Sequence, residues 1–218
     1  MHPIRRLIHD FEDLVNLPVE PDDVRKWIVD HGFCDEVRVH YVDCDPLAFD
    51  GLYIERQGGA LIEHHAAYGA PHIVREIFIN KNLSVERRRL AEVKECLHIL
   101  DALIQRSATL DKINDMIVFA ATRMRLKEKV DGPDVGMWAD IAAFPQALAI
   151  LFPWETRHLL KPKFDAGQLS SAEIADMVEL PVAYVETVLS DQWESSYDFV
   201  LSCGDRHYEE VEVAKAGE

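Results

Sequence analysis

Lys94, Glu95 and His98 form the group of side chains with the clearest chemical potential, in the run Lys94-Glu95-Cys96-Leu97-His98. The spacing matches the H-E-x-x-H pattern of zinc peptidases, in which two histidines one helical turn apart bind the metal and the glutamate deprotonates the metal-bound water. Here a lysine replaces the first histidine. A protonated lysine would repel a cation, and its reference pKa of about 10.4 means that strong desolvation would be needed to neutralise it.

The run is predicted to lie on a long helix that begins after Ser84, a typical N-cap residue. Apolar residues recur at spacings of three and four along this segment, so one stripe should face a core; they are Leu90, Val93, Leu97, Leu100 and Ile104. A short strand over residues 76–80 precedes the helix. Lys94, Glu95 and His98 are therefore expected at the edge of a buried helix face.

The rest of the sequence predicts an α+β fold with a small N-terminal sheet followed by a helical bundle. Helices are expected over residues 3–16 and 20–32, and strands over residues 37–42, 52–55 and 60–63, with a hairpin at Gly58–Gly59. Further helices are expected over residues 107–130 and 134–152, the latter kinked or divided by Pro145.

The C-terminal part is predicted to be a separate small unit. Ser170 and Glu173 form a capping-box pattern, and Leu180-Pro181 separates two short apolar segments, as in a helix-turn-helix. The second segment, residues 182–189, contains no lysine or arginine, which favours packing or partner binding over DNA binding. We expect a main domain over residues 1–165, a helical unit over 166–203 and an acidic tail over 204–218.

Composition narrows the classes of function. The chain has 218 residues, 48% of them hydrophobic, and a formal net charge of -16, which is typical of a folded domain and disfavours nucleic acid and anionic membranes as partners. No apolar run is long enough to cross a bilayer, and the N-terminus lacks an apolar signal core. A cytoplasmic protein is therefore expected. The cysteines are far apart, so we expect free thiols.

Two segments resemble the ImmA/IrrE family of zinc peptidase-like proteins from bacteria and their mobile elements. The family pattern is a strand ending in asparagine, then a helix with R-R-x-F-T-x-A-H-E-x-x-H; the sequence has Ile77-Phe78-Ile79-Asn80 and then Arg87-Arg88-Arg89-Leu90-Ala91-Glu92-Val93-Lys94-Glu95-Cys96-Leu97-His98. A later segment resembles E-x-x-A-N-x-F-A-x-x-L-L-M-P, whose glutamate is a metal ligand in the family. Asp140 falls on that position, one methylene shorter. The resemblance implies a zincin-like bundle and a regulatory role involving a repressor-type protein.

Three hypotheses follow. The first is a degenerate, metal-free member that regulates by binding a protein partner, with the Lys94 ammonium replacing the metal and pairing with Glu95 or Asp140, and with no cofactor. The second is an active zinc peptidase with Glu95 as general base and His98 and Asp140 as ligands. One of His64, His65 and His72 would then supply the ligand that Lys94 has replaced. The third is a DNA-associated regulator that uses the C-terminal helices. The metal content of the protein separates the first two hypotheses.

Overall fold

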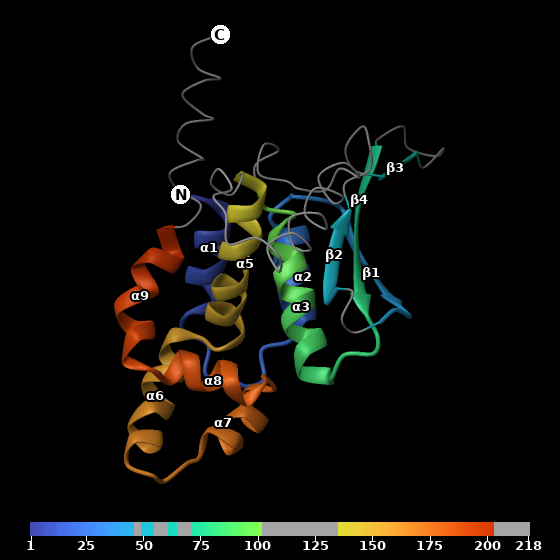
Figure 1. Ribbon diagram of the computed structural model, residues 1–218. Coiled ribbons are helices and arrows are strands. Elements are labelled where there is room, and N and C mark those ends of the chain that lie inside the picture. The colour runs from blue at the N-terminus through green and yellow to red at the C-terminus, as the bar shows by residue number, and fades with distance from the viewer. Residues whose placement is uncertain (46–48, 55–60, 65–70, 102–134, 203–218) are drawn as a thin grey trace, which may run out of the picture.

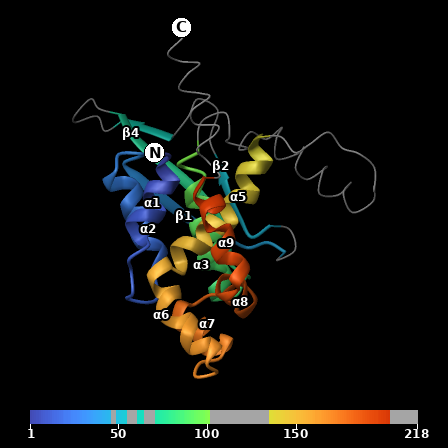
Figure 2. The ribbon, with the colours of Figure 1, turned by 90° about the vertical axis from the view of Figure 1, so that its left-hand side faces the viewer.

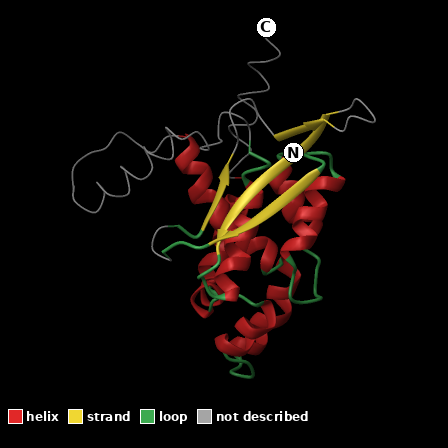
Figure 3. Cartoon of the chain, turned by 90° about the vertical axis from the view of Figure 1, so that its right-hand side faces the viewer, coloured by secondary structure: helices red, strands yellow, loops and turns green. Residues whose placement is uncertain are grey.

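The structure is a computed structural model in which residues 1–45, 49–54, 61–64, 71–101 and 135–202 are described. Within these ranges the protein is mixed α+β, as expected, with a small sheet beside a larger group of helices (Figure 1). Figure 3 shows the sheet in front of the helices, so the described helices lie on one of its faces.

The sheet is built around one long strand, β4 (Pro71–Asn80). Strand β1 (Glu36–Val42) pairs with β4 in parallel. Strands β2 (Gly51–Ile54) and β3 (Leu61–His64) both pair with β4 antiparallel, β2 along residues 76–79 and β3 along residues 71–74. Because β2 and β3 run in the same direction, they cannot form a hairpin with each other, so the predicted hairpin is wrong.

Two helices precede the sheet and pack on the same side as the later bundle. Helix α1 (Pro3–Phe11) buries Ile4, Leu7, Ile8 and Phe11. Helix α2 (Pro21–Asp30) is tied to α1 by a hydrogen bond of 2.8 Å from Trp27 Nε1 to Asp10 Oδ2. Helix α1 is shorter than the predicted span of residues 3–16, because the Glu12 N–H already closes a tighter turn onto the His9 carbonyl.

The centre of the bundle is formed by α3 (Val85–Leu97) and α5 (Val135–Leu151). Helix α3 packs against β2 and β4, and α5 packs against α1, α3 and α9. The last residues of α5 and the residue after it, 147–152, are all buried. This is expected for a helix that is apolar on every side. The helix continues through Pro145, so of the two predicted outcomes, a kink or a division, the division does not occur.

Four shorter helices complete the described chain: α6 (Trp154–Asp165), α7 (Ser171–Val178), α8 (Val182–Leu189) and α9 (Asp191–Ser202). The capping box predicted at Ser170 and Glu173 is confirmed, whereas α6 and α9 were not predicted. Figure 2 shows these helices below and beside the N-terminal ones. Their buried residues, among them Ile174, Val185 and Trp193, belong to the same hydrophobic cluster as those of α1 and α3.

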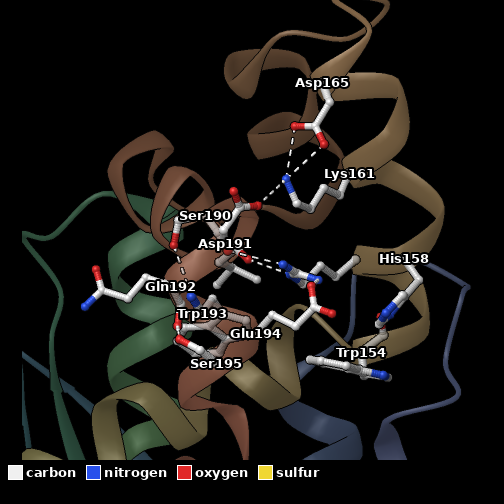
Figure 4. A network of polar contacts seen from close by, with 12 residues as sticks. Trp154, His158, Lys161, Asp165, Ser190, Asp191, Gln192, Trp193, Glu194 and Ser195 are labelled. Carbon is white, nitrogen blue, oxygen red and sulfur yellow. Dashed lines mark hydrogen bonds and ion pairs between the residues drawn. The ribbon is translucent and has the colours of Figure 1, made fainter.

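A polar network joins α6 to α8 and α9 (Figure 4). The Arg157 side chain is 1% exposed and donates to the carbonyls of Val188 at 2.8 Å and Ser190 at 3.2 Å, and to Glu194 Oε2 at 3.2 Å. Nearer the surface, Lys161 lies 2.9 Å from Asp165 Oδ2 and 3.0 Å from Asp191 Oδ1. These contacts fix the entry to α9 against α6.

The predicted helix over residues 107–130 and the acidic tail lie outside the described residues. Strand β4 is longer than the predicted span of residues 76–80, because residues 71–74 pair with β3. No helix in the described ranges is both long and apolar enough to cross a membrane.

Candidate functional site

Helix α3 is positioned by its cap, its apolar stripe and its arginines. The Ser84 hydroxyl accepts a hydrogen bond from the Arg87 N–H at 3.3 Å, which confirms the predicted N-cap. Leu90, Val93, Leu97 and Leu100 are buried as predicted, and Ile104 lies outside the described residues. Of the arginines at its start, Arg87 pairs with Asp50 and Arg89 with Glu20, so these two contact different parts of the fold.

Two of these arginines hold the helix to other parts of the fold. The guanidinium of Arg87 donates to both carboxylate oxygens of Asp50, each at 2.8 Å. Arg89 is buried and pairs with Glu20 at 2.7 Å and with Glu179, in the turn between α7 and α8, at 3.1 Å. Arg87 and Arg89, at the start of α3, therefore fix this helix to other parts of the fold.

Asn80, at the end of β4, holds the loop that leads into β2. Its side chain is fully buried and donates to the carbonyls of Asp45 and Phe49, each at 3.1 Å. Its oxygen accepts from the Asn82 N–H at 3.0 Å. The strand-ending asparagine thus fixes the approach of β2 to α3, where the candidate site lies.

Glu95 lies against the backbone of β2. The residue is 3% exposed, and its Oε2 accepts a hydrogen bond of 2.8 Å from the Tyr53 N–H. Its Oε1 lies 3.2 Å from Lys94 Nζ. A Cβ atom at Gly51 would lie 2.7 Å from the Glu95 Cγ, so a glycine is required there for this close approach. The structure therefore brings Lys94 and Glu95 together as an ion pair under the strand.

Both oxygens of the Glu95 carboxylate are engaged in this arrangement. A general base must reach the proton that it removes through a hydrogen bond to the reacting group or water. Here the contacts are instead with a backbone N–H and an ammonium group. The arrangement supports a carboxylate that binds strand to helix and is compensated by a lysine.

His98 lies at the very end of α3, where it is the C-cap residue. It is 5% exposed, and its Nδ1 lies 2.7 Å from Oδ2 of Asp101, so the ring N–H donates to that carboxylate. Histidines that bind metals are usually oriented in this way by a carboxylate. Asp101 was not identified from the sequence, although its position three residues after His98 was a usable signal.

The backbone places Asp140 in the first half of α5. Helices α3 and α5 pack against each other and run in opposite directions, so α5 begins at the end where α3 finishes (Figure 1). The side chain of Asp140 lies outside the described residues, as do those of His64, His65 and His72. Their roles as metal ligands stay predictions.

Among the described side chains no metal centre is assembled. They contain no group of three or more histidine, cysteine, aspartate or glutamate side chains that could hold a metal ion. Glu95 is engaged by the Tyr53 N–H and by the Lys94 ammonium. Cys96, inside the motif, is fully buried in the core, and this burial raises the pKa of its thiol to about 12. A thiol with such a pKa is a poor metal ligand, because the thiolate is the form that binds metals.

Sequence reasoning missed Gly51 and Tyr53, which shape the surroundings of Glu95. Tyr53 contributes its backbone N–H, so its residue type carried no signal, and the contact spans 42 residues of chain. Gly51 is one glycine among ten in the sequence. Its importance follows only from the close approach of Glu95.

Comparison with known proteins gives no match: neither a family model nor a curated protein sequence aligns with this chain.

Proposed function

We propose that this protein is a metal-free relative of the ImmA/IrrE peptidases that acts in regulation by binding a protein partner. The observation that carries the proposal is the double engagement of Glu95, by Lys94 Nζ at 3.2 Å and by the Tyr53 N–H at 2.8 Å. In this proposal the Lys94 ammonium replaces the positive charge of the metal. The buried carboxylate is thereby compensated without a cation from solution.

The choice of a protein as partner rests on charge and on the resemblance. A formal net charge of -16 opposes binding to phosphate backbones. The family resemblance of residues 77–98 points to a repressor-type protein. Helix α8, the candidate DNA-reading helix, contains no lysine or arginine, and its Glu186 accepts a hydrogen bond from Ser171 Oγ at 3.0 Å. The DNA-associated alternative therefore ranks last.

The first test is the metal content of the full chain purified without chelators. We expect far less than one zinc per chain by elemental analysis. The matched variant is Lys94→His, which restores the H-E-x-x-H pattern and should raise zinc affinity. One tightly bound zinc per wild-type chain would contradict the proposal.

The active zinc peptidase, with Glu95 as general base and His98 and Asp140 as ligands, is the second candidate. One observation favours it: His98 is held by Asp101 at 2.7 Å, as a metal-binding histidine would be. It requires hydrolysis of a repressor-type protein by the zinc-loaded chain. Glu95→Gln should abolish that hydrolysis while leaving zinc binding intact. Equal activity of wild type and Glu95→Gln would exclude this candidate.

A further inference from the structure

A second polar region lies between the start of α2, the end of β1 and the first half of α3. It is a cavity of about 400 Å³, which is within the size range of ligand pockets. Its charged lining residues are Glu20, Asp22, Arg88, Arg89 and Glu92. None of the residues Lys94, Glu95 and His98 takes part, so the cavity is separate from the site described above.

The arginines of this region are shared between carboxylates. Arg89 contacts Glu20 at 2.7 Å and a second glutamate, in the turn between α7 and α8, at 3.1 Å. Arg25 forms ion pairs with both Asp22 and the buried Glu92. Even when the other arginine of the lining is counted, the carboxylates outnumber the guanidinium groups. The region is therefore net negative, within a chain whose formal net charge is -16.

The carboxylates of the lining keep hydrogen-bonding capacity. Among the described residues, Asp22 accepts a hydrogen bond only at Oδ1 and Glu20 only at Oε2. Glu92 is 3% exposed, and its Oε2 accepts a hydrogen bond of 3.0 Å from the Tyr41 hydroxyl. Its Oε1 contacts Arg25 but accepts no hydrogen bond from any described residue. Buried polar atoms normally have a hydrogen-bond partner, so this lining favours a ligand that donates several hydrogen bonds.

Two exposed side chains lie beside these charged groups in the lining. Val85 is 53% exposed and Tyr41 is 54% exposed. Lysine and arginine pack their methylene stems on such surfaces while their charged groups stay with polar partners. A guanidinium also stacks on the ring of a tyrosine. The cavity therefore offers contacts to both parts of a long basic side chain.

We propose that this cavity binds a basic side chain, arginine or lysine, of the partner protein. The carboxylates of Glu20, Asp22 and Glu92 bind its charged group. Tyr41 and Val85 contact its stem. The inference rests on the proposed function for the partner being a protein, but it does not depend on the metal content of the polar centre. Failure of the peptide experiment and failure of the zinc analysis can therefore be distinguished.

The test is a nuclear magnetic resonance titration of the full ¹⁵N-labelled chain with an N-acetylated, C-amidated tripeptide that has arginine between two alanines. The matched probe has citrulline in place of arginine, which keeps the planar shape but lacks the charge. We expect the arginine peptide to shift the amide signals of Asp22, Tyr41 and residues 88–92. The citrulline peptide should bind at least about tenfold more weakly.

A third peptide, with lysine in place of arginine, identifies which basic side chain the cavity takes. Binding as tight as that of the arginine peptide supports recognition of the charge alone. Weaker binding supports recognition of the forked guanidinium, which donates in a fixed planar geometry.

Three variants complete the design. Asp22→Asn removes one lining carboxylate and should lower the affinity for the arginine peptide about two- to fivefold, as expected for one exposed ion pair. Asp23→Asn makes the same change one residue further along α2, outside the lining, and should leave the affinity unchanged. Arg88→Gln removes a like charge from the lining and should raise the affinity. The amide spectrum of each variant reports whether it folds.

Equal binding of the arginine and citrulline peptides would overturn the proposal, as would no binding of either basic peptide. Equal losses for Asp22→Asn and Asp23→Asn would mean that the peptide responds only to the overall negative charge of the chain, which also overturns it. Weaker binding by Arg88→Gln would contradict the repulsion that a cationic ligand must meet from Arg88.

Discussion

The polar centre on α3 and the polar network of α6, α8 and α9 both keep charged side chains away from water, but with different partners. Lys94 is 21% exposed as a side chain and pairs with Glu95, the next residue along its own helix. Arg157 is 1% exposed and donates to two backbone carbonyls and a carboxylate from another part of the chain. The first contact is local, whereas the second joins segments that are separate in sequence.

The difference shows that a charged residue can be important for the structure without belonging to a recognisable sequence motif. The Lys94 run attracts notice because of its spacing, whereas Arg157 belongs to no such motif and donates to the carbonyls of Val188 and Ser190 and to Glu194. The backbone carbonyls of Val188 and Ser190 are fixed in orientation by the chain. Removal of Arg157 therefore leaves these acceptors without the hydrogen bonds that it donates.

The largest effect is expected for Arg157→Ala. This change should lower the free energy of unfolding by about 3–5 kcal/mol, because it removes a buried cation from its acceptors and leaves a void. Urea denaturation followed by circular dichroism measures the loss. Arg157→Lys keeps the charge but not the planar fork, and should give a smaller loss. A loss below about 1 kcal/mol for Arg157→Ala would mean that this buried network stabilises the protein no more than an exposed ion pair does.

An intermediate effect is expected for Gly51→Ala, which tests the close approach of β2 to Glu95. The added methyl group would lie 2.7 Å from the Glu95 Cγ, and such overpacking costs about 1–3 kcal/mol. In the background of Glu95→Ala the colliding atom is gone, so the cost of Gly51→Ala should fall. The double-mutant cycle should give a coupling above about 0.5 kcal/mol.

Gly167→Ala is the control for that cycle. At Gly167 a Cβ atom would meet nothing within 4 Å, but the backbone has φ +67, so the substitution is costly through the backbone alone. Its cost should be the same with and without Glu95→Ala. Equal coupling of both glycines to Glu95 would argue against a direct contact at Gly51.

The smallest effect is expected for Lys161→Ala, at the edge of the Arg157 network. Its partners Asp165 and Asp191 are 53% and 94% exposed as side chains. Pairs with partners in water contribute less than about 1 kcal/mol and weaken with salt. The same denaturation experiment at low and high salt measures this difference. A loss as large as that of Arg157→Ala would mean that the network acts as one unit.

Much of the fold could be predicted because its signals are local. The Ser84 cap, the apolar stripe of α3 and the capping box at Ser170 each depend on residues a few positions apart. The strands β1, β2 and β3 were located to within a few residues for the same reason. Their partners were not found, because the connections from β2 to β3 and from β3 to β4, residues 55–60 and 65–70, have equal length, so spacing could not show that β3 pairs with β4 and not with β2.

The candidate site was only partly accessible from the sequence. The predicted pairing of Lys94 with Glu95 is confirmed, whereas the pairing with Asp140 stays a prediction because that side chain lies outside the described residues. The engagement of Glu95 by the Tyr53 N–H involves a backbone group, which no residue type reveals. The importance of Arg157 was missed because its acceptors are carbonyls 31 and 33 residues away. Backbone partners over such separations carry no sequence signal.

The central place of β4 has a consequence for synthesis on the ribosome. Strands β1, β2 and β3 all leave the exit tunnel before β4, with which each of them pairs. Until Asn80 has emerged, these segments have no partner strand within the described chain, and their backbone groups depend on water. Helix α1 and α2 can form earlier from local contacts. The nascent chain should therefore gain its sheet in one late step, and ribosome-bound chains that stop before residue 71 should be far more sensitive to protease than chains that extend past α3.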